Sequence, residues 1–198
     1  MGFTPSPGSA PKKVSAKIVV AGGFGVGKTT LVGSVSEIPP VNTEAIMTQA
    51  SVPYDDLSKT PDKQTTTVAM DFGRITIARD LVLYLFGTPG QSRFWFMWED
   101  LTRGAIGAVI IVDTRRLEDS FQAIDYFEKY TDLPFLIAVN HFEGVPMHPV
   151  EDIRNALALE DDVPIVVFDA RDRRQSAGVL AKLVEYTMNF NAETALSR

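Results

Sequence analysis

The sequence predicts an α/β fold, a three-layer sandwich in which helices cover both faces of a six-stranded, mostly parallel sheet. Two observations predict it. Short apolar runs rich in β-branched residues alternate with helical segments along the 198 residues, which is typical of β-α-β units with parallel strands. Two neighbouring strand-like runs, 68–77 and 81–86, are instead joined by a short polar turn, Ala78–Asp80, and predict one antiparallel edge hairpin.

The first part of the chain supplies one strand and one helix. Residues 1–13 carry no apolar period and many proline and small polar residues, so we expect a disordered N-terminal arm. A strand is expected over 14–21. A helix is expected over 28–37, because Pro39 and Pro40 prevent its continuation.

Residues 41–66 form a long polar segment without a clear helical or strand pattern. Loops longer than about 12–15 residues are usually functional or disordered. Because this segment follows a glycine-rich loop and the first helix, we expect it to form a lid over a bound ligand. A plain surface insertion is the alternative.

The rest of the chain continues the alternation of strands and helices. We expect the domain to span 14–189 and a C-terminal tail to occupy 190–198. The expected strands are 105–113, 134–139 and 163–168, and the expected helices are 92–101, 120–130, 150–157 and 174–189. The residues predicted to face the core from the helix at 120–130, at a spacing of three, are Phe121, Ile124, Phe127 and Tyr130.

Composition and charge exclude several classes of function. A hydrophobic content of 45% and a charged content of 22% are ordinary for a globular protein, whereas a net charge of −6 argues against a nucleic-acid-binding surface. The absence of cysteine excludes a disulfide framework and thiolate metal sites. The longest apolar run, 105–112, is far too short to span a membrane. We therefore expect a cytoplasmic protein without direct membrane insertion.

The segment Lys17–Thr30 contains the motif G-x-x-x-x-G-K-[ST] between a strand and a helix, the setting in which it binds phosphate in P-loop NTPases. Its glycines let backbone N–H groups converge on an anion, and the helix N-terminus adds donors and the positive end of a dipole. The lysine reaches the outer phosphates, and the threonine hydroxyl can bind Mg²⁺. The expected phosphate-binding residues are Gly22, Gly23, Phe24, Gly25, Val26, Gly27, Lys28, Thr29 and Thr30.

Three further loops follow predicted strands. Ligands of such sheets bind beyond the carboxyl ends of the strands, so these loops should lie near the phosphate-binding loop. They are 87–91 (Gly-Thr-Pro-Gly-Gln), 140–143 (Asn-His-Phe-Glu) and 169–171 (Asp-Ala-Arg).

With these motifs in this order, residues 14–189 resemble the Ras superfamily of small GTPases. The resemblance is greatest to the bacterial gliding-motility, or MglA-like, branch, and the runs 67–73 and 83–91 look like the actinobacterial conservon-encoded GTPases. The resemblance implies a switch that binds GTP and GDP with Mg²⁺. It also implies, as partners, a roadblock-type protein and a sensor-kinase-like membrane complex that could recruit the protein to the membrane periphery.

The resemblance also assigns roles to single residues. Thr67 matches the switch threonine that meets Mg²⁺ and the γ-phosphate, and Thr29 is the other expected metal ligand. Gly90 matches the glycine whose N–H senses the γ-phosphate, and Gln91 matches the glutamine that orients the attacking water. The expected catalytic residues are Gln91, Lys28 and Gly90.

One expected metal-binding side chain is missing. The third motif of the family starts with an aspartate that holds Mg²⁺ through water, and here that position is Gly87. The MglA-like branch also lacks this aspartate, so the departure agrees with the subfamily while it weakens the expected metal site. The sequence shows no obvious replacement. Asp113 ends a neighbouring strand, where a turn residue is the simpler interpretation.

The base-recognition motif N-K-x-D of the family stands here as residues 140–143. A carboxylate accepts hydrogen bonds from guanine N1–H and its 2-amino group, whereas adenine offers neither donor, so Glu143 favours guanine. His141 replaces the lysine and could stack on the base. Residues 169–171 stand at the family's S-A-K motif, where the Ala170 N–H would reach guanine O6. The expected base-binding residues are Asn140, His141, Glu143, Asp169, Ala170 and Arg171.

The leading hypothesis is a guanine-nucleotide-binding molecular switch that slowly hydrolyses GTP to GDP and signals through its switch loops to partner proteins. A second hypothesis, favoured by Gly87, is a nucleotide-binding interaction module with little or no hydrolysis. A third, favoured by the imperfect base motif, is an ATP-binding protein. The large side chains at 94–98 cannot all face one core, so some are expected at a partner interface.

Overall fold

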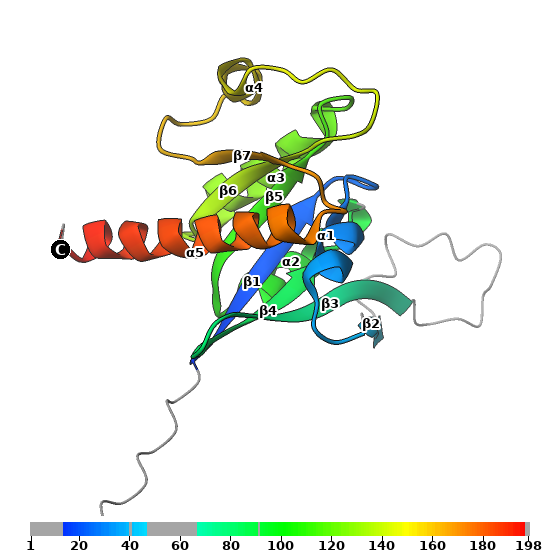
Figure 1. The fold of residues 1–198 in the computed structure, drawn as a ribbon, viewed down its shortest axis with the longest axis vertical. Helices are drawn as coiled ribbons and strands as arrows, with labels where there is room; N and C mark the ends of the chain where they lie inside the picture. The colour runs from blue at the N-terminus through cyan, green and yellow to red at the C-terminus, as the bar shows by residue number, and fades with distance from the viewer. Residues whose placement is uncertain (1–13, 40, 47–66, 91, 197–198) are drawn as a thin grey trace, which may run out of the picture.

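The computed structural model describes residues 14–39, 41–46, 67–90 and 92–196, which form one sheet with helices on both faces (Figure 1). The strand order is β2-β3-β4-β1-β5-β6-β7. β3 runs antiparallel to both of its neighbours, and the other pairs are parallel, so the α/β class and the β3–β4 hairpin are confirmed. The strands are β1 (Val14–Gly22), β2 (Val41–Ile46), β3 (Thr67–Ala78), β4 (Leu81–Gly87), β5 (Ala105–Val112), β6 (Phe135–Asn140) and β7 (Ile165–Phe168).

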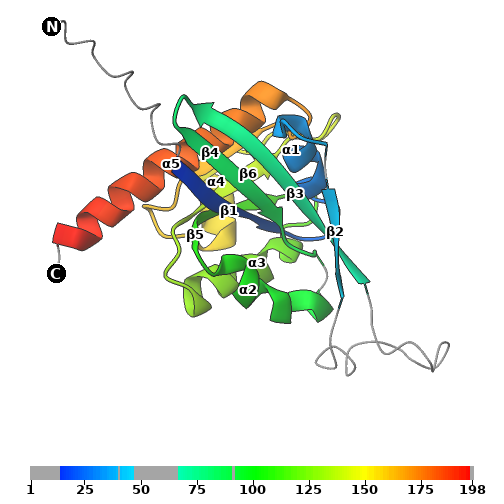
Figure 2. The same cartoon turned by 90° about the horizontal axis from the view of Figure 1, so that it is seen from below.

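The helices form two layers, one on each face of the sheet (Figure 2). Successive residues of a strand point to opposite faces, and β1 shows this: Ile18 packs with α1 and α5, whereas Val19 packs with α2, α3 and α4. The helical segments are α1 (Lys28–Val35), the 3₁₀ helix η3 (Ser92–Met97), α2 (Trp98–Thr102), α3 (Glu118–Tyr130), α4 (Val150–Leu157) and α5 (Arg173–Leu196).

The sheet has seven strands rather than the expected six, because β2 lies within the segment assigned to a loop. β2 pairs antiparallel with β3, from Val41 opposite Phe72 to Ile46 opposite Thr67. β4 pairs with one edge of β3, so the other edge is free, and backbone hydrogen bonds there hold a strand that shows little apolar alternation. The rest of the expected lid, 47–66, lies outside the described residues.

The buried face of α3 differs from the expected one. Ile124 and Phe127 are buried as predicted, but Phe121 is 43% exposed and Tyr130 is 75% exposed. Steps of three residues fall short of the 3.6-residue turn, so over nine residues the direction drifts to the opposite side of the helix. Ser120 and Ala123 complete the buried face.

The C-terminal helix is longer than the sequence suggests. α5 continues to Leu196, so most of the segment assigned to a tail is helical. Among the described residues, no helix is both long and apolar enough to cross a membrane. The segment 94–98 divides as expected, since Trp98 is buried whereas Phe96 is 42% exposed.

Candidate nucleotide-binding site

The phosphate-binding loop, residues 22–27, joins β1 to α1 at the carboxyl end of the sheet (Figure 1). Gly22, Gly25 and Gly27 have φ angles of 134°, 74° and 114°, which residues with side chains rarely adopt. A Cβ on Gly27 would also lie 2.7 Å from the side-chain nitrogen of Asn140. The conformation of the loop therefore depends on glycine, in agreement with the motif.

Lys28 holds this loop from the inside. Its Nζ donates to the Gly22 carbonyl at 2.9 Å and to the Gly23 carbonyl at 2.5 Å, and its side chain is buried. Burial lowers the pKa of Lys28 from 10.5 to about 8, and the nearby Asp71 carboxylate opposes this shift. Burial disfavours the ammonium form of Lys28. The negative charge of a phosphate group bound beside it would favour that form and raise the pKa again.

The Asp71 carboxylate lies beside Thr29 and Gly87. The Thr29 hydroxyl donates to Asp71 Oδ2 at 2.6 Å. In the β3–β4 register Phe72 faces Phe86, which places Asp71 beside Gly87. A Cβ on Gly87 would lie 2.9 Å from the Asp71 Cβ and 3.0 Å from its Oδ2. Gly87 thus leaves the space that the Asp71 carboxylate occupies, and β3 supplies the carboxylate that β4 lacks.

Asp71 is not among the site residues expected from the sequence, although it lies in the run 67–73. In the structure Ala78 pairs with Leu81, and a register shift between Thr76 and Ala78 places Phe72 opposite Phe86 and so Asp71 beside Gly87. Asp71 and Gly87 lie far apart in the sequence, and only the register between β3 and β4 brings them together.

The oxygen atoms of Thr29 and Asp71 are the donors that could hold a metal ion here. Hydroxyl and carboxylate oxygens suit hard cations, and Mg²⁺ is commonly held by one or two protein ligands together with phosphate oxygens and water. Within the described part of the chain, no group of three or more His, Cys, Asp or Glu side chains could hold a metal ion by itself. The donors therefore fit a Mg²⁺ ion that arrives with a phosphate.

Asp113, the other carboxylate considered from the sequence, has a different partner. It is fully buried, and Arg115 donates to its Oδ1 at 2.9 Å and to its Oδ2 at 2.7 Å. These hydrogen bonds lower the pKa of Asp113. The same guanidinium lies 3.7 Å from the ring centroid of Phe142, so Arg115 ties the end of β5 to the loop after β6.

The turn after β4 lies against the phosphate-binding loop. A Cβ on Gly90 would lie 2.8 Å from Lys28 Nζ and 2.9 Å from the Cα of Phe24. The structure therefore brings together Gly90 and the groups expected to contact the outer phosphate. Phe24 itself is 67% exposed at the tip of the loop.

The structure gives no contact with this loop for Gln91, Thr67 or Thr30. Gln91 lies outside the described residues. The backbone of Thr67 begins β3, opposite Ile46. Thr30, in the first turn of α1, is exposed. Their expected roles remain predictions.

Asn140 joins the phosphate-binding loop to the loops after β6 and β7, residues 140–143 and 169–171, which contain the residues expected to bind the base and are called the base side below. Its side chain is buried, its Nδ2 donates to the Val26 carbonyl at 2.9 Å, and its Oδ1 accepts from the Ala170 N–H at 3.0 Å. Both hydrogen bonds cross between loops that are far apart in the sequence, so one amide fixes their relative positions. The Ala170 N–H, expected at guanine O6, donates to Asn140 in this structure.

Four charged or titratable side chains gather on the base side. Arg171 donates to Asp169 from Nη2 to Oδ2 at 2.8 Å, and its hydrogen bonds lower the pKa of Asp169 to about 2, with a smaller contribution from His141. Glu143 helps Asp169 to raise the pKa of Arg171. The structure thus brings the predicted residues of the two loops together, and Glu143 and Arg171 are exposed.

The geometry of the site agrees with comparisons of the sequence with known families. Residues 20–190 match the model of a family described as "Conserved hypothetical ATP binding protein". The chain belongs to this family of conserved hypothetical ATP binding proteins.

The chain is also similar to Ras-related proteins. Over 172 residues it is 32% identical to Ras-related protein Rab-7b of Bos taurus and 24% identical to Rab-7b of Homo sapiens, covering 81% of the chain and 76% of each relative. It is 35% identical over 105 residues, 53% of the chain, to the uncharacterized protein MJ1339 of Methanocaldococcus jannaschii. That match spans 55% of MJ1339, so the chain covers about half of the length of this relative.

The fold of the chain is similar to that of solved G domains. The G domain of the T. maritima FeoB iron transporter superposes with a TM-score of 0.62 at 16% identity, covering 87% of the chain and 99% of that domain. The cytosolic domain of the same transporter in a GDP form gives a TM-score of 0.63 at 17% identity, covering 88% of the chain and 64% of that protein. The protein is therefore a nucleotide-binding protein with a G-domain fold.

Proposed function

We propose that the protein is a guanine-nucleotide-binding molecular switch that binds GTP and slowly hydrolyses it to GDP. The observation that carries this proposal is the Asn140 amide, which bonds to the phosphate-binding loop through Val26 and to the base-side loop through Ala170. One nucleotide could then contact both loops at once. The phosphate end would meet Lys28 and the backbone N–H groups of the loop.

The preference for guanine rests on Glu143. An exposed carboxylate on the base side can accept from guanine N1–H and the 2-amino group, whereas adenine has no donor at these positions. The Ras-related relatives favour guanine, and the name of the family favours adenine. An ATP-binding protein is therefore the second candidate, and Glu143 is the residue that separates the two.

The metal site of this proposal contains Thr29, Asp71 and, from the sequence analysis, Thr67. A Mg²⁺ ion bound there would neutralise charge on the outer phosphates. Thr29 and Asp71 are already hydrogen-bonded, at 2.6 Å, so Asp71 orients the hydroxyl before a ligand binds. The proposed site thus retains a carboxylate despite Gly87, which weakens the main reason for a nucleotide-binding module without hydrolysis.

Hydrolysis in this proposal depends on Gly90 and Gln91. The Gly90 backbone lies against Lys28, where it would contact the γ-phosphate, and Gln91 would orient the attacking water. The switch segments would be 87–98 and 41–67. The comparable intrinsic rate of Ras is about 10⁻⁴ s⁻¹, so turnover should be slow without a partner. Gln91→Leu should lower single-turnover GTP hydrolysis while the affinity for GTP is retained, and unchanged turnover would contradict the role of Gln91.

The proposed partners are those that the resemblance implies, a roadblock-type protein and a sensor-kinase-like membrane complex. Their proposed place is the cytoplasmic side of a membrane, to which they would recruit this protein peripherally. The narrower MglA-like or conservon-type assignment belongs to the same proposal. Single-turnover GTP hydrolysis with and without such partners tests it, and stimulation of the rate is the expected outcome.

The test of the base assignment is competition for a fluorescent guanine nucleotide. The purified protein is loaded with N-methylanthraniloyl-GDP in Mg²⁺, and GDP and ADP are titrated separately. GDP should displace the label at a concentration at least about tenfold lower than ADP, the effect of one mismatched group of hydrogen bonds. Equal displacement would remove the guanine assignment, and stronger displacement by ADP would favour the ATP-binding alternative.

A further inference from the structure

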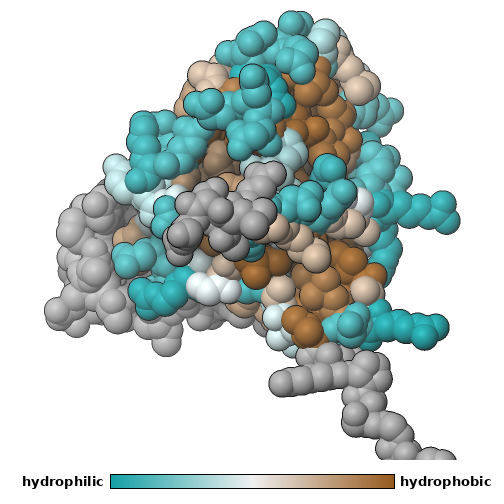
Figure 3. All heavy atoms as spheres, turned by 90° about the vertical axis from the view of Figure 1, so that its left-hand side faces the viewer, coloured by the Kyte–Doolittle hydropathy of each residue, from teal (hydrophilic) through white to brown (hydrophobic). Residues whose placement is uncertain are grey.

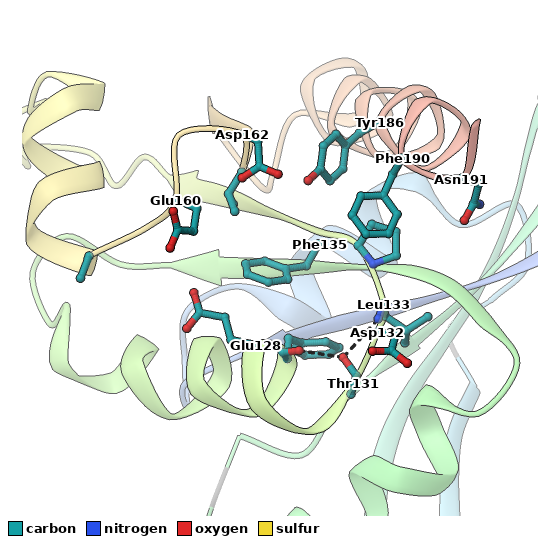
Figure 4. A pocket seen from close by; sticks show the side chains of 14 residues that line it. Glu128, Thr131, Asp132, Leu133, Phe135, Glu160, Asp162, Tyr186, Phe190 and Asn191 are labelled. Carbon is teal, nitrogen blue, oxygen red and sulfur yellow. Dashed lines mark hydrogen bonds between the residues drawn. The ribbon is translucent and has the colours of Figure 1, made fainter. Parts of the chain in front are cut away.

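A groove of about 970 Å³ lies at the end of the sheet opposite the nucleotide-binding site (Figure 4). Its walls come from three segments: the end of α3 with the following turn, the connection from α4 to β7, and the last turns of α5. Phe135, in the groove, begins β6, and Asn140, in the nucleotide-binding site, ends it. Five steps along a strand span roughly 16 Å, so both places could be occupied together.

The floor and one wall of the groove are aromatic. Phe127 and Phe135 form the floor, with ring centroids 6.1 Å apart and little exposure. Tyr186 and Phe190 on α5 form the wall, with centroids 6.2 Å apart, and both are half-buried. The face of the molecule that carries the end of α5 shows brown apolar surface between teal polar residues (Figure 3).

Four carboxylates border this aromatic surface on two opposite sides. Figure 4 shows Glu160 and Asp162 on one side of Phe135, and Glu128 and Asp132 on the other. None of the residues that line the groove is a lysine or an arginine, and within the described part of the chain none of the four carboxylates has a salt bridge.

Glu128 on one wall and Glu160 on the other repel each other across the groove. Burial raises the pKa of Glu128, and the charges of Asp125 and Glu160 raise it further. Lys129, which lies next to Glu128 and lowers its pKa in part, forms its salt bridge with Asp125 at 3.0 Å. A positive charge placed between the walls would therefore relieve a repulsion that the free protein retains.

We propose that this groove binds a basic segment of a partner protein. Lysine or arginine side chains of that segment would lie between the acidic walls, Glu128 and Asp132 on one side and Glu160 and Asp162 on the other. An apolar side chain between them would pack on the half-buried rings of Tyr186 and Phe190, and a cation over an aromatic ring adds a favourable contact. The volume matches a short peptide segment rather than one side chain.

The charge of the groove argues against a second copy of this chain as the occupant. The chain carries a net charge of −6, and a two-fold contact would place the same four carboxylates against themselves. Like charges directly opposed across an interface cost free energy. A basic partner segment is the occupant that charge complementarity favours.

The experiment is a selection of twelve-residue peptides displayed on phage against the full chain. Peptides that also bind a variant with all four substitutions, Glu128→Gln, Asp132→Asn, Glu160→Gln and Asp162→Asn, are removed by counter-selection. The surviving peptides should carry at least two basic residues around an aromatic or aliphatic one. Synthetic copies should bind about tenfold more weakly when either wall is neutralised, since exposed ion pairs contribute modestly.

The matched control neutralises two exposed carboxylates outside the groove, Glu151→Gln and Asp152→Asn on α4. This variant should bind the peptides within about threefold of the unmodified protein. Equal weakening by the control would show a general charge effect and would overturn the proposal. Failure to enrich basic peptides, or peptides whose binding is unchanged when either wall alone is neutralised, would also overturn it.

Two further measurements separate this proposal from misfolding and from a small-molecule site. The thermal midpoint of Glu160→Gln should not fall, because this change relieves repulsion with Glu128. Each variant should retain the GDP affinity of the unmodified protein, so the outcome for the groove does not depend on the proposed function. Spermidine serves as the free-cation probe, and displacement of the peptides by micromolar spermidine would overturn the peptide assignment.

Discussion

The candidate site has two halves that are built in different ways. The phosphate half contains the phosphate-binding loop and Lys28, and the base half contains the loops 140–143 and 169–171. In the phosphate half, buried groups and glycine backbone set the geometry, as the Lys28 and Gly27 contacts show. In the base half, Glu143 and Arg171 are exposed, and Arg171 is held by hydrogen bonds to Asp169 from its Nη2 and its backbone N–H. The first half therefore cannot change without a cost to the fold, whereas the second can change its ligand preference and leave the fold intact.

The largest expected effect comes from a methyl group added to the phosphate half. Gly27→Ala forces a Cβ to within 2.7 Å of Asn140 at a φ of 114°, so it should lower the free energy of unfolding by about 1–3 kcal/mol and weaken nucleotide binding more than about 100-fold. Chemical denaturation and titration with a fluorescent GDP analogue measure both.

The control for that prediction is the same substitution in α5. A Cβ on Gly178 would meet nothing within 4 Å. Gly178→Ala should raise the free energy of unfolding by about 0.5–1 kcal/mol, because glycine is unfavourable inside a helix, and should leave binding unchanged. Similar losses in the two variants would contradict the special conformation of the loop.

A second prediction exchanges the two residues that share one space in the phosphate half. Asp71→Gly and Gly87→Asp should each weaken Mg²⁺-dependent binding of GTP by about tenfold or more, the first by loss of the carboxylate and the second by crowding Asp71. The double exchange returns a single carboxylate to the space and should restore much of the affinity.

Titration of a GTP analogue at several Mg²⁺ concentrations distinguishes the outcomes. Asp80→Asn in the exposed hairpin turn is the control and should have no effect. If the loss of binding free energy in the double variant equals the sum of the losses in the two single variants, Asp71 and Gly87 act separately.

The base half should respond in specificity rather than in stability. Glu143→Gln should reduce the preference for GDP over ADP by about tenfold, because the amide replaces one acceptor by a donor. The free energy of unfolding should change by less than about 0.5 kcal/mol, since the side chain is exposed. Competition binding and denaturation of the same preparation measure the two quantities. A loss of stability with an unchanged preference for GDP would show that Glu143 supports the fold and does not select the base.

The smallest expected effect is the acid dependence of the Asp169–Arg171 pair. The pKa of Asp169 is lowered from 3.8 to about 2 by Arg171, so the pair stabilises the fold above pH 4 and loses this contribution as the pH falls from about 4 to 2. The Arg171 side chain is 62% exposed, so the contribution should be below about 1 kcal/mol.

Asp169→Asn should remove that part of the acid dependence. Denaturation at pH 5 and pH 3 measures it, with Asp161→Asn at an exposed position as the control. An unchanged difference between the two pH values in Asp169→Asn would show that the pair has no role in stability.

The sequence predicts the features that depend on local pattern. The phosphate-binding loop, the β3–β4 hairpin and the loops after β6 and β7 all follow from residue spacing, because each has a backbone requirement visible in a few consecutive residues. Lys28 and Asn140 are examples: the structure places both next to the phosphate-binding loop as expected.

Features that depend on pairing between distant segments were not predicted. β2 is an edge strand that pairs with the backbone of β3 and shows no regular alternation of apolar and polar residues, and Asp71 lies beside Gly87 because of the β3–β4 register. The face of α3 was misassigned because a spacing of three does not follow the helical turn, as the exposure of Tyr130 shows.

The position of Asp71 beside Gly87 has a consequence for the classification of related sequences. An inventory that scores each sequence for an aspartate at the start of the third motif would count this chain as degenerate. The structure suggests a rule that uses strand pairing: a glycine at that position counts as intact when the residue beside it on the paired strand is acidic. Applied to uncharacterised chains, such a rule would separate proteins that moved their carboxylate to the adjacent strand from those that lost it.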